Sequence, residues 1–251
     1  MELLKIASKA SCFRRELGED AMSPIDIFTR ALTLEGLSIL LYPLGEGISG
    51  MCVKSEDTAV IAVNSAMSKG RQRFSLAHEL YHYKYGKIGE STICSSGFSG
   101  SSTPSIEQEA DRFASYLLLP PGAYEDRIES ARIKKGFLEL ADFISIEQQY
   151  GLSHMAMLWR LTDDGMITQR ENLRFKEGVI KESRRLGYDT DLYRIIGETH
   201  AQRKVLGHYI KMADLLLEQH KISYGKYDEF MLAGFREDIV YGDEEDEQVD
   251  D

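Results

Sequence analysis

One helix-forming segment organises this chain of 251 residues: RQRFSLAHELYHYKYG, residues 71–86. It places His78 and His82 four positions apart, and residues four apart on an α-helix lie one above the other on the same face. Both imidazoles can therefore point at one metal ion, and Zn²⁺ binds imidazole nitrogen at about 2.0–2.1 Å. Glu79 is rotated by roughly 100° from His78. Its carboxylate would lie beside the metal, where it could take a proton from a bound water.

The pentapeptide HELYH alone does not separate a metal site from an ordinary polar helix face. Apolar residues surround it on the same helix: Phe74, Leu76, Ala77, Leu80 and Tyr81. The two histidines are therefore expected on or beside a buried face. Buried imidazoles need partners, and a single metal ion would serve both of them.

A second segment, IEQEADRFASYLLL (106–119), contains the candidate third ligand. Ala110 and Ala114 lie on its apolar stripe, and Glu107 lies on the same stripe. A carboxylate on a core-facing stripe is costly unless it is paired or bound to metal, so Glu107 is the predicted ligand. A fourth position would stay open for water, as catalytic zinc sites require. Asp111 can accept a hydrogen bond from a ligating histidine and fix its tautomer.

Two alternatives stay open for this second helix. Glu107 could be an exposed acid near the helix N-terminus, where the macrodipole favours negative charge. Glu109 is the fallback ligand, and because it points roughly 200° away from Glu107, both cannot serve.

The two segments together resemble the ImmA/IrrE family of zinc metallopeptidases. The resemblance depends on NSAMSKGRQRFSLAHELYHYKYG (64–86) and IEQEADRFASYLLLP (106–120), with TAVIAVN (58–64) just upstream. It covers roughly residues 23–165. It implies a zincin-like fold with a gluzincin-like site.

The resemblance also implies roles for single residues. His78, His82 and Glu107 would bind zinc, and Glu79 would be the general base. Known members cleave a helix-turn-helix transcriptional repressor, and some relatives belong to toxin–antitoxin-like pairs. The sequence departs from the family at Tyr81, where many members have glycine.

The predicted elements indicate an α+β fold. A short helix within 23–36 precedes three strand-like runs at 37–42, 50–53 and 58–64. Their short connections favour a small antiparallel sheet. From about residue 123 the chain has helical periodicity, so strands and helices are segregated rather than alternating.

The chain is expected to divide into four parts: a zincin-like domain (1–122), a helical, helix-turn-helix-like segment packed on it (123–170), a C-terminal helical region (171–236) and an acidic, disordered tail (237–251). The helix-turn-helix-like pattern contains few basic residues, so it is expected to pack on the core or dock a partner. Within the third part, residues 200–221 are expected to form an amphipathic helix with surface histidines.

The Gly/Ser-rich stretch 87–104 is expected to be a surface loop. It contains Cys94, which could reach the zinc. A thiolate in the open position would exclude water and silence the enzyme until displaced. The plainer interpretation is a free thiol on a surface loop.

Substrate contacts can also be predicted. Zincins bind an extended substrate along an edge strand, and residues 58–64 are the candidate strand. Tyr81 and Tyr83 are candidate cleft or oxyanion-stabilising residues.

Composition excludes other classes. The net charge is −11, and seven acids lie in the last nine residues, which leaves −4 for the rest. The chain thus lacks the basic excess that non-specific nucleic-acid binding requires, and direct DNA binding is not expected.

Three cysteines without a CxxC pair indicate a reducing compartment. No apolar run approaches the roughly 18–20 residues of a membrane span, and no signal segment is seen. A cytoplasmic protein without membrane association is expected.

The sequence therefore predicts a zinc-dependent endopeptidase that cleaves a helix-turn-helix repressor or antitoxin. The alternative is a non-catalytic interaction protein of a toxin–antitoxin or regulatory pair, in which zinc is a structural brace. A closed site with a fourth protein ligand, such as Cys94, would favour the brace. An open site with water would favour the peptidase.

Overall fold

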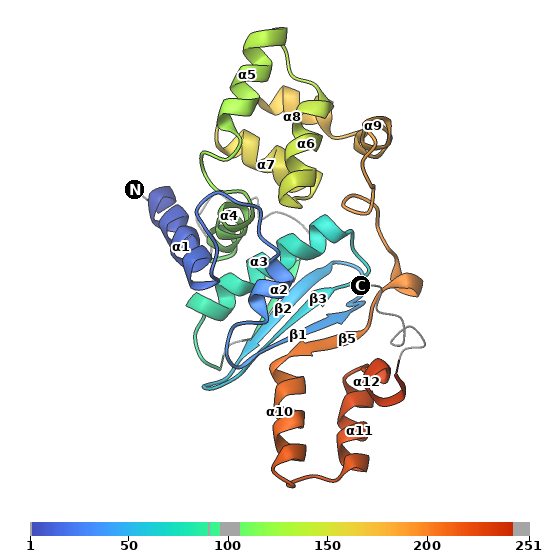
Figure 1. Cartoon of the computed structure of the whole chain (residues 1–251). Coiled ribbons are helices and arrows are strands. Elements are labelled where there is room, and N and C mark those ends of the chain that lie inside the picture. The colour runs from blue at the N-terminus through green and yellow to red at the C-terminus, as the bar shows by residue number, and fades with distance from the viewer. Residues whose placement is uncertain (1, 90, 96–105, 243–251) are drawn as a thin grey trace, which may run out of the picture.

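A five-stranded mixed sheet forms the centre of the fold within residues 2–89, 91–95 and 106–242, which the computed structural model describes (Figure 1). The strands lie in the order β4-β2-β3-β1-β5. Their bounds are β1 Leu37–Tyr42, β2 Ile48–Lys54, β3 Ala59–Asn64, β4 Ser91–Ser95 and β5 Lys204–Gly207. With helices before, between and after the strands, the α+β class expected from the sequence is confirmed.

The prediction of an antiparallel sheet is wrong for one pair of strands. β1 and β3 are parallel, in a register that runs from Leu37 opposite Ala59 to Tyr42 opposite Asn64. The chain between β1 and β2 is short, but five residues reach up to about 17 Å. Two strand spacings amount to only about 10 Å. The connection can therefore pass over one strand position, which β3 then fills.

This strand order also corrects the candidate substrate strand. β3, which contains most of residues 58–64, pairs with β1 on one side and with β2 on the other. Its backbone groups are committed to the sheet, so it has no edge to which a peptide could add. The strands at the two ends of the order are β4 and β5.

Strand β4 was not predicted, because residues 87–104 have the composition of a loop. Residues 91–95 instead form a strand that pairs antiparallel with β2, with Cys94 opposite Gly50. The available edge of β2, rather than a local pattern, determines this strand. Residues 96–104 of the predicted loop lie outside the described residues.

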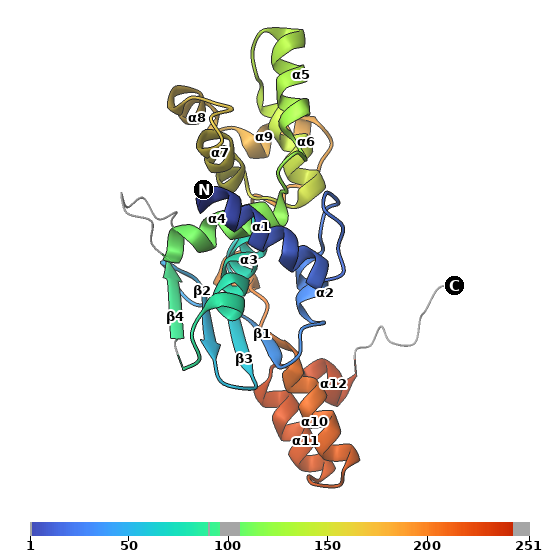
Figure 2. The ribbon, with the colours of Figure 1, turned by 90° about the vertical axis from the view of Figure 1, so that its left-hand side faces the viewer.

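Two long helices pack beside each other above the sheet: α3 (Lys69–Tyr85) and α4 (Ile106–Leu118). α3 begins at Ser68, whose side chain accepts a hydrogen bond from the Arg71 amide. The N-terminal helix α1 (Glu2–Glu16), which the sequence analysis did not predict, lies along α4 (Figure 2). The buried Arg14 joins them, with Nη1 donating to the Leu117 carbonyl at 2.6 Å.

The short helix predicted within residues 23–36 is α2 (Ile27–Ala31). It begins after Asp26, whose side chain accepts a hydrogen bond from the Thr29 amide and so caps the helix.

A group of helices stands above α3 and α4 in Figure 1. Its members are α5 Glu125–Lys135, α6 Leu140–Tyr150, α7 His154–Asp163, α8 Gln169–Phe175 and α9 Val179–Arg185. The helix-turn-helix-like segment corresponds to α6 and α7, joined through Gly151 at φ +65°. The buried Arg160 of α7 reaches the end of α4, where its Nη1 donates to Ser115 Oγ at 3.1 Å and to the Leu119 carbonyl at 3.2 Å.

The C-terminal part is not entirely helical, and the helix predicted over residues 200–221 is divided. β5 occupies residues 204–207 and pairs antiparallel with β1. Gly207, at φ +85°, then separates it from α10 (His208–Glu218). Helical periodicity could not anticipate this strand, because it forms on the edge that β1 offers.

α11 (Tyr224–Ala233) and α12 (Glu237–Tyr241) complete the C-terminal part below the sheet (Figure 1). Residues 237–241, predicted as part of the tail, are thus helical, whereas the acidic residues 243–251 lie outside the described part. In that described part, no helix combines the length and apolar character needed to cross a membrane.

Candidate metal centre

The three predicted zinc ligands meet at one point between α3 and α4. His78 Nε2 lies 3.3 Å from His82 Nε2 and 3.2 Å from Glu107 Oε2. Glu107 Oε1 lies 3.4 Å from His82 Nε2. Both histidines are buried and Glu107 is half-buried. Glu107 lies in the first turn of α4 with its side chain 43% exposed, as the alternative interpretation expected, yet its carboxylate also lies within 3.4 Å of both histidines.

Asp111 lies where the helical spacing predicted, one turn after Glu107. Its Oδ1 is 2.9 Å from His78 Nδ1. A proton on Nδ1 would be donated to this carboxylate, so Nε2, which lies toward His82 and Glu107, is the nitrogen that would give up its proton to bind a metal. The hydrogen bond thus presents His78 in the tautomer that a metal requires.

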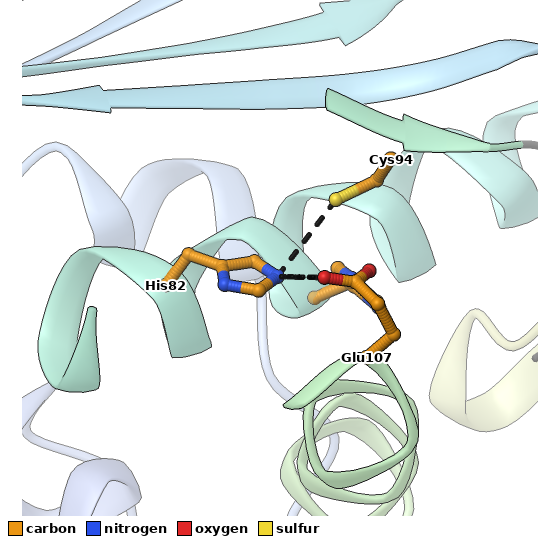
Figure 3. Close-up of side chains that lie close together, drawn as sticks. His82, Cys94 and Glu107 are labelled. Carbon is orange, nitrogen blue, oxygen red and sulfur yellow. Dashed lines mark hydrogen bonds and ion pairs between the residues drawn. The ribbon is translucent and has the colours of Figure 1, made fainter. Parts of the chain in front are cut away.

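Cys94 is a fourth member of this group. Its Sγ lies 3.8 Å from His82 Nε2, and one ligand atom each from His78, His82, Cys94 and Glu107 all lie within 4.8 Å of one another. Figure 3 shows His82, Cys94 and Glu107 converging from α3, β4 and α4. The thiol is buried, so the interpretation of Cys94 as a thiol on a surface loop is wrong.

These spacings fit a tetrahedral zinc ion. With metal bonds of about 2.0–2.1 Å to nitrogen and oxygen, tetrahedral ligand atoms lie about 3.3 Å apart. The three distances among His78, His82 and Glu107 are 3.2–3.4 Å. Imidazole, carboxylate and thiolate are also the side-chain groups that zinc prefers.

Glu79 faces a gap that only glycine permits. Its carboxylate is fully buried, and within the described part of the chain neither oxygen has a hydrogen-bond partner. A Cβ built on Gly50 of β2 would lie 2.9 Å from Glu79 Oε1. Gly50 therefore makes the room that the buried Glu79 carboxylate itself occupies. Sequence reasoning missed Gly50, because nothing near it in the chain points to Glu79.

Burial and mutual charge shift the pKa values of these groups in the protein without metal. Burial raises the pKa of Glu79 to about 7, against the opposing effect of charge on His78. Burial also opposes charge on His78, but hydrogen bonds to Asp111 and Glu107 raise its pKa to about 9. The hydrogen bond from His78 lowers the pKa of Glu107. The carboxylates of Asp111 and Glu107 therefore favour positive charge beside His78, as a cation site requires.

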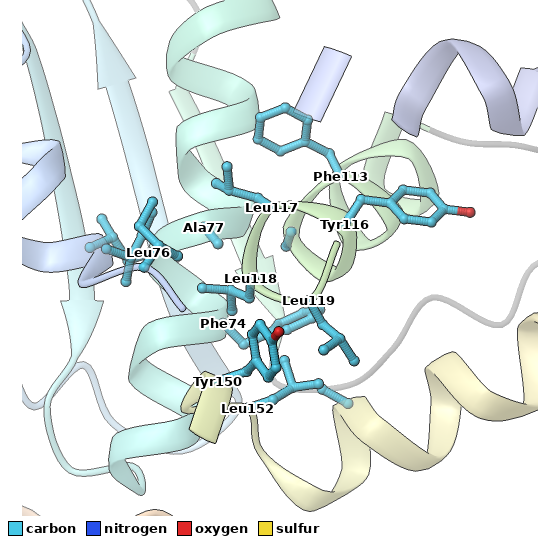
Figure 4. Close-up of a cluster of buried hydrophobic side chains, with 14 of the residues drawn as sticks. Phe74, Leu76, Ala77, Phe113, Tyr116, Leu117, Leu118, Leu119, Tyr150 and Leu152 are labelled. Carbon is cyan, nitrogen blue, oxygen red and sulfur yellow. The ribbon is translucent and has the colours of Figure 1, made fainter. Parts of the chain in front are cut away.

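Apolar packing between α3 and α4 holds the ligands in place (Figure 4). Phe74 and Ala77 on α3 and Phe113 and Leu117 on α4 are almost completely buried. The buried Ala110 and Ala114 allow the two helices to approach closely. The ligands therefore project from two rigid elements rather than from loops.

Three other predicted residues point elsewhere. The Tyr81 hydroxyl donates to Glu109 Oε2 at 2.5 Å, and Lys9 Nζ lies 3.4 Å from the same oxygen. This places Glu109, the fallback ligand, apart from the metal cluster. The Tyr83 hydroxyl donates to the Glu35 carbonyl at 3.3 Å. Neither hydroxyl is directed at the cluster, so the structure does not support an oxyanion role for Tyr81 or Tyr83.

A cavity of about 790 Å³ lies near the first turn of α3. Arg71, His154 and Tyr193 are among its lining residues. Burial lowers the pKa of Arg71, against the favourable charge of Asp111. Arg71, on the first turn of α3, therefore faces the cavity, and the sequence contained no signal for it.

The fold and the geometry define a class: an α+β protein with two histidines and a glutamate positioned on neighbouring helices for a metal ion. The family model Peptidase_M78, described as IrrE N-terminal-like domain, matches residues 29–162, more than half of the chain. The chain therefore belongs to this family of metal-dependent peptidases, which confirms the resemblance drawn from the two motifs. The comparison with curated proteins gave no match.

Proposed function

We propose that this protein is a zinc-dependent endopeptidase with His78, His82 and Glu107 as metal ligands and Glu79 as general base. One observation carries the proposal: three ligand atoms converge at 3.2–3.4 Å from one another, beside the buried carboxylate of Glu79 that has no partner in the described chain. Membership of a peptidase family supports the same reaction class.

Each side chain of the site has its own role in the proposed hydrolysis. A bound zinc ion would polarise a water molecule and the scissile carbonyl. Glu79 accepts the proton of the attacking water and returns it to the leaving amine. Asp111 keeps His78 in the tautomer that presents Nε2 to the metal.

Strand β4 is the edge to which we assign the substrate. It stands at the end of the strand order, and its Cys94 lies in the metal cluster. An extended peptide that adds to the outer edge of β4 would pass close to the metal. The cavity beside Arg71 offers room for substrate side chains. Resemblance to proteins that cleave helix-turn-helix repressors supports such a repressor, or an antitoxin, as the substrate.

The decisive experiment incubates the zinc-loaded protein with the helix-turn-helix repressor or antitoxin encoded beside it. Wild type is expected to cleave it at a defined bond. Glu79→Gln should keep one zinc per chain but lose about 10²–10⁴-fold in rate, because proton transfer is removed. Glu109→Gln is the matched control, since this acid of α4 is bound to Tyr81 and Lys9, and it should cleave like wild type. Cleavage by Glu79→Gln at the wild-type rate would refute the assigned mechanism.

A second function is favoured by one observation, the position of Cys94 in the cluster. A fourth protein ligand would close the site, as in structural zinc sites, and the protein would then be a zinc-braced partner rather than an enzyme. The same incubation separates the two. If wild type and Cys94→Ala both bind zinc and the repressor but leave the repressor intact, the brace would be favoured.

A further inference from the structure

Strand β4 directs one side chain at the metal cluster and the next away from it. Cys94 is 3% exposed, whereas its neighbour Ile93 is 64% exposed. Successive side chains of a strand point to opposite faces of the sheet. Cys94 therefore lies on the inner face, toward α3, as a consequence of the strand register and not of a chance loop conformation.

A β-bulge in the partner strand sets this register. The pairing of β2 with β4 shifts between Ile48 and Gly50, which leaves Ser49 as the extra residue. The Ser49 hydroxyl donates to the Cys94 carbonyl at 3.2 Å and holds the backbone of that residue. Bulges beside active sites commonly re-aim a side chain, and here the bulge places Cys94 opposite Gly50.

Gly50 leaves the space that the Glu79 carboxylate occupies. It has no side chain, and a Cβ there would collide with Glu79. Cys94 lies opposite this glycine on β4, and its thiol interacts with the Glu79 carboxylate. A thiol bound to the metal would therefore stand beside the proposed general base.

The position of Cys94 Sγ fits the fourth corner of a tetrahedron. For bonds of about 2.3 Å to sulfur and 2.0–2.1 Å to nitrogen, these two ligand atoms lie about 3.6 Å apart. Cys94 Sγ lies 3.8 Å from His82 Nε2, and the set of four ligand atoms is within 4.8 Å throughout. Small adjustments of one side chain would complete the coordination.

We propose that Cys94 is a fourth zinc ligand that closes the site, so that the resting protein is a latent peptidase. The proposal rests on the zinc site proposed above, but the ligation itself does not depend on peptidase activity. Release of Cys94 Sγ, with its electron pair and a proton taken from solvent, vacates the position that the attacking water needs. The short strand β4, which pairs only with β2 among the described residues, is the element whose displacement achieves this.

The test replaces zinc by Co²⁺ and records the absorption spectrum, because a cobalt–thiolate bond produces an intense charge-transfer band. Wild type is expected to bind one Co²⁺ per chain and to show the band, and Cys94→Ala to bind Co²⁺ with loss of the band. Cys52→Ala is the matched control, since Cys52 is equally buried, on the neighbouring strand and outside the cluster. It should keep the band.

A second measurement needs no variant. The metal-free and zinc-loaded wild-type proteins are alkylated and the labelled cysteines are identified by mass spectrometry. Zinc should protect Cys94 and leave the exposed Cys12 as reactive as before. Equal labelling of Cys94 with and without zinc would contradict ligation, even if the Cys94 variant did not fold.

The outcomes separate this proposal from the proposed function. One bound Co²⁺ without the band in wild type overturns the role of Cys94 and leaves the three-ligand site intact. Absence of any bound Co²⁺ or zinc overturns the metal site and this proposal together. Latency is read from repressor hydrolysis: Cys94→Ala should cleave faster than wild type, and an equal or lower rate would overturn the latency.

Discussion

Two buried histidines of this protein face carboxylates in similar ways but differ at their second nitrogen. His78 Nδ1 lies 2.9 Å from Asp111, and His154 Nδ1 lies 2.7 Å from Glu147. The second nitrogen of His154 meets the Phe175 carbonyl at 2.7 Å. That of His78 instead meets two other candidate ligands, Glu107 Oε2 at 3.2 Å and His82 Nε2 at 3.3 Å.

The network around His154 is complete without a metal. The Tyr193 hydroxyl donates to the other oxygen of Glu147 at 2.8 Å, so both oxygens and both ring nitrogens are satisfied. A buried histidine–carboxylate pair is therefore no sign of a metal site by itself. The sign is a set of ligand atoms from several side chains that converge on one point, as at His78, His82 and Glu107.

The largest difference between the two kinds of histidine should be the loss of zinc binding when a metal ligand is removed. His82→Ala should lose more zinc affinity than the about 10–100-fold that an outer hydrogen-bonding partner contributes. His154→Ala should keep one zinc per chain. Competition with a chromophoric chelator measures both affinities. Equal loss in the two variants would remove the distinction between the histidines.

The next effect concerns folding stability. His154→Leu leaves Glu147 buried without its partner, which should lower the free energy of unfolding by about 3–5 kcal/mol. The double variant with Glu147→Leu should recover most of that loss, because no unpaired charge stays buried. Urea unfolding in the presence of zinc measures both. A single variant as stable as wild type would show that this pair does not hold α6 and α7 together.

A smaller effect is expected from the residue that orients His78. Asp111→Asn keeps the size of the side chain but weakens the acceptor, and zinc affinity should fall about 10–100-fold. Asp163→Asn is the control, since that acid pairs with Arg112 outside the cluster. Chelator competition again gives the affinities, and an unchanged value for Asp111→Asn would argue against tautomer control.

The smallest effect is on the pH dependence of stability. Burial opposes charge on His154, but hydrogen bonds with Glu147 and the Phe175 carbonyl outweigh it and raise its pKa. The resulting stabilisation is complete below the unfolded pKa of about 6.5 and is lost as pH rises through the higher folded pKa. Above about pH 6.5, wild type should therefore lose stability relative to His154→Leu, with a slope below about 1.4 kcal/mol per pH unit.

This pH dependence is measured as the difference between two proteins, both saturated with zinc. Titrating groups that contact neither His154 nor Glu147 then contribute equally and cancel. Parallel stability curves for wild type and His154→Leu would show that His154 is neutral in the folded protein.

The sequence by itself determined the elements of the site that depend on helical spacing. His78 with His82, and Glu107 with Asp111, are each four residues apart, and an α-helix brings such residues to one face in any context. The apolar residues around both pairs predicted which faces would be buried. The same two motifs identified the family, because the residue spacing within each motif and the order of the two motifs can be read directly from the sequence.

Only the tertiary structure decided which groups share the site with those ligands. Cys94 joins the cluster because β4 pairs with the edge of β2, and Glu79 has room for its carboxylate because Gly50 of β2 lacks a side chain. The same kind of pairing inserted β3 between β1 and β2 and added β5 to the sheet. Strand pairing depends on which backbone edge is available in space, so no local pattern in the sequence records it.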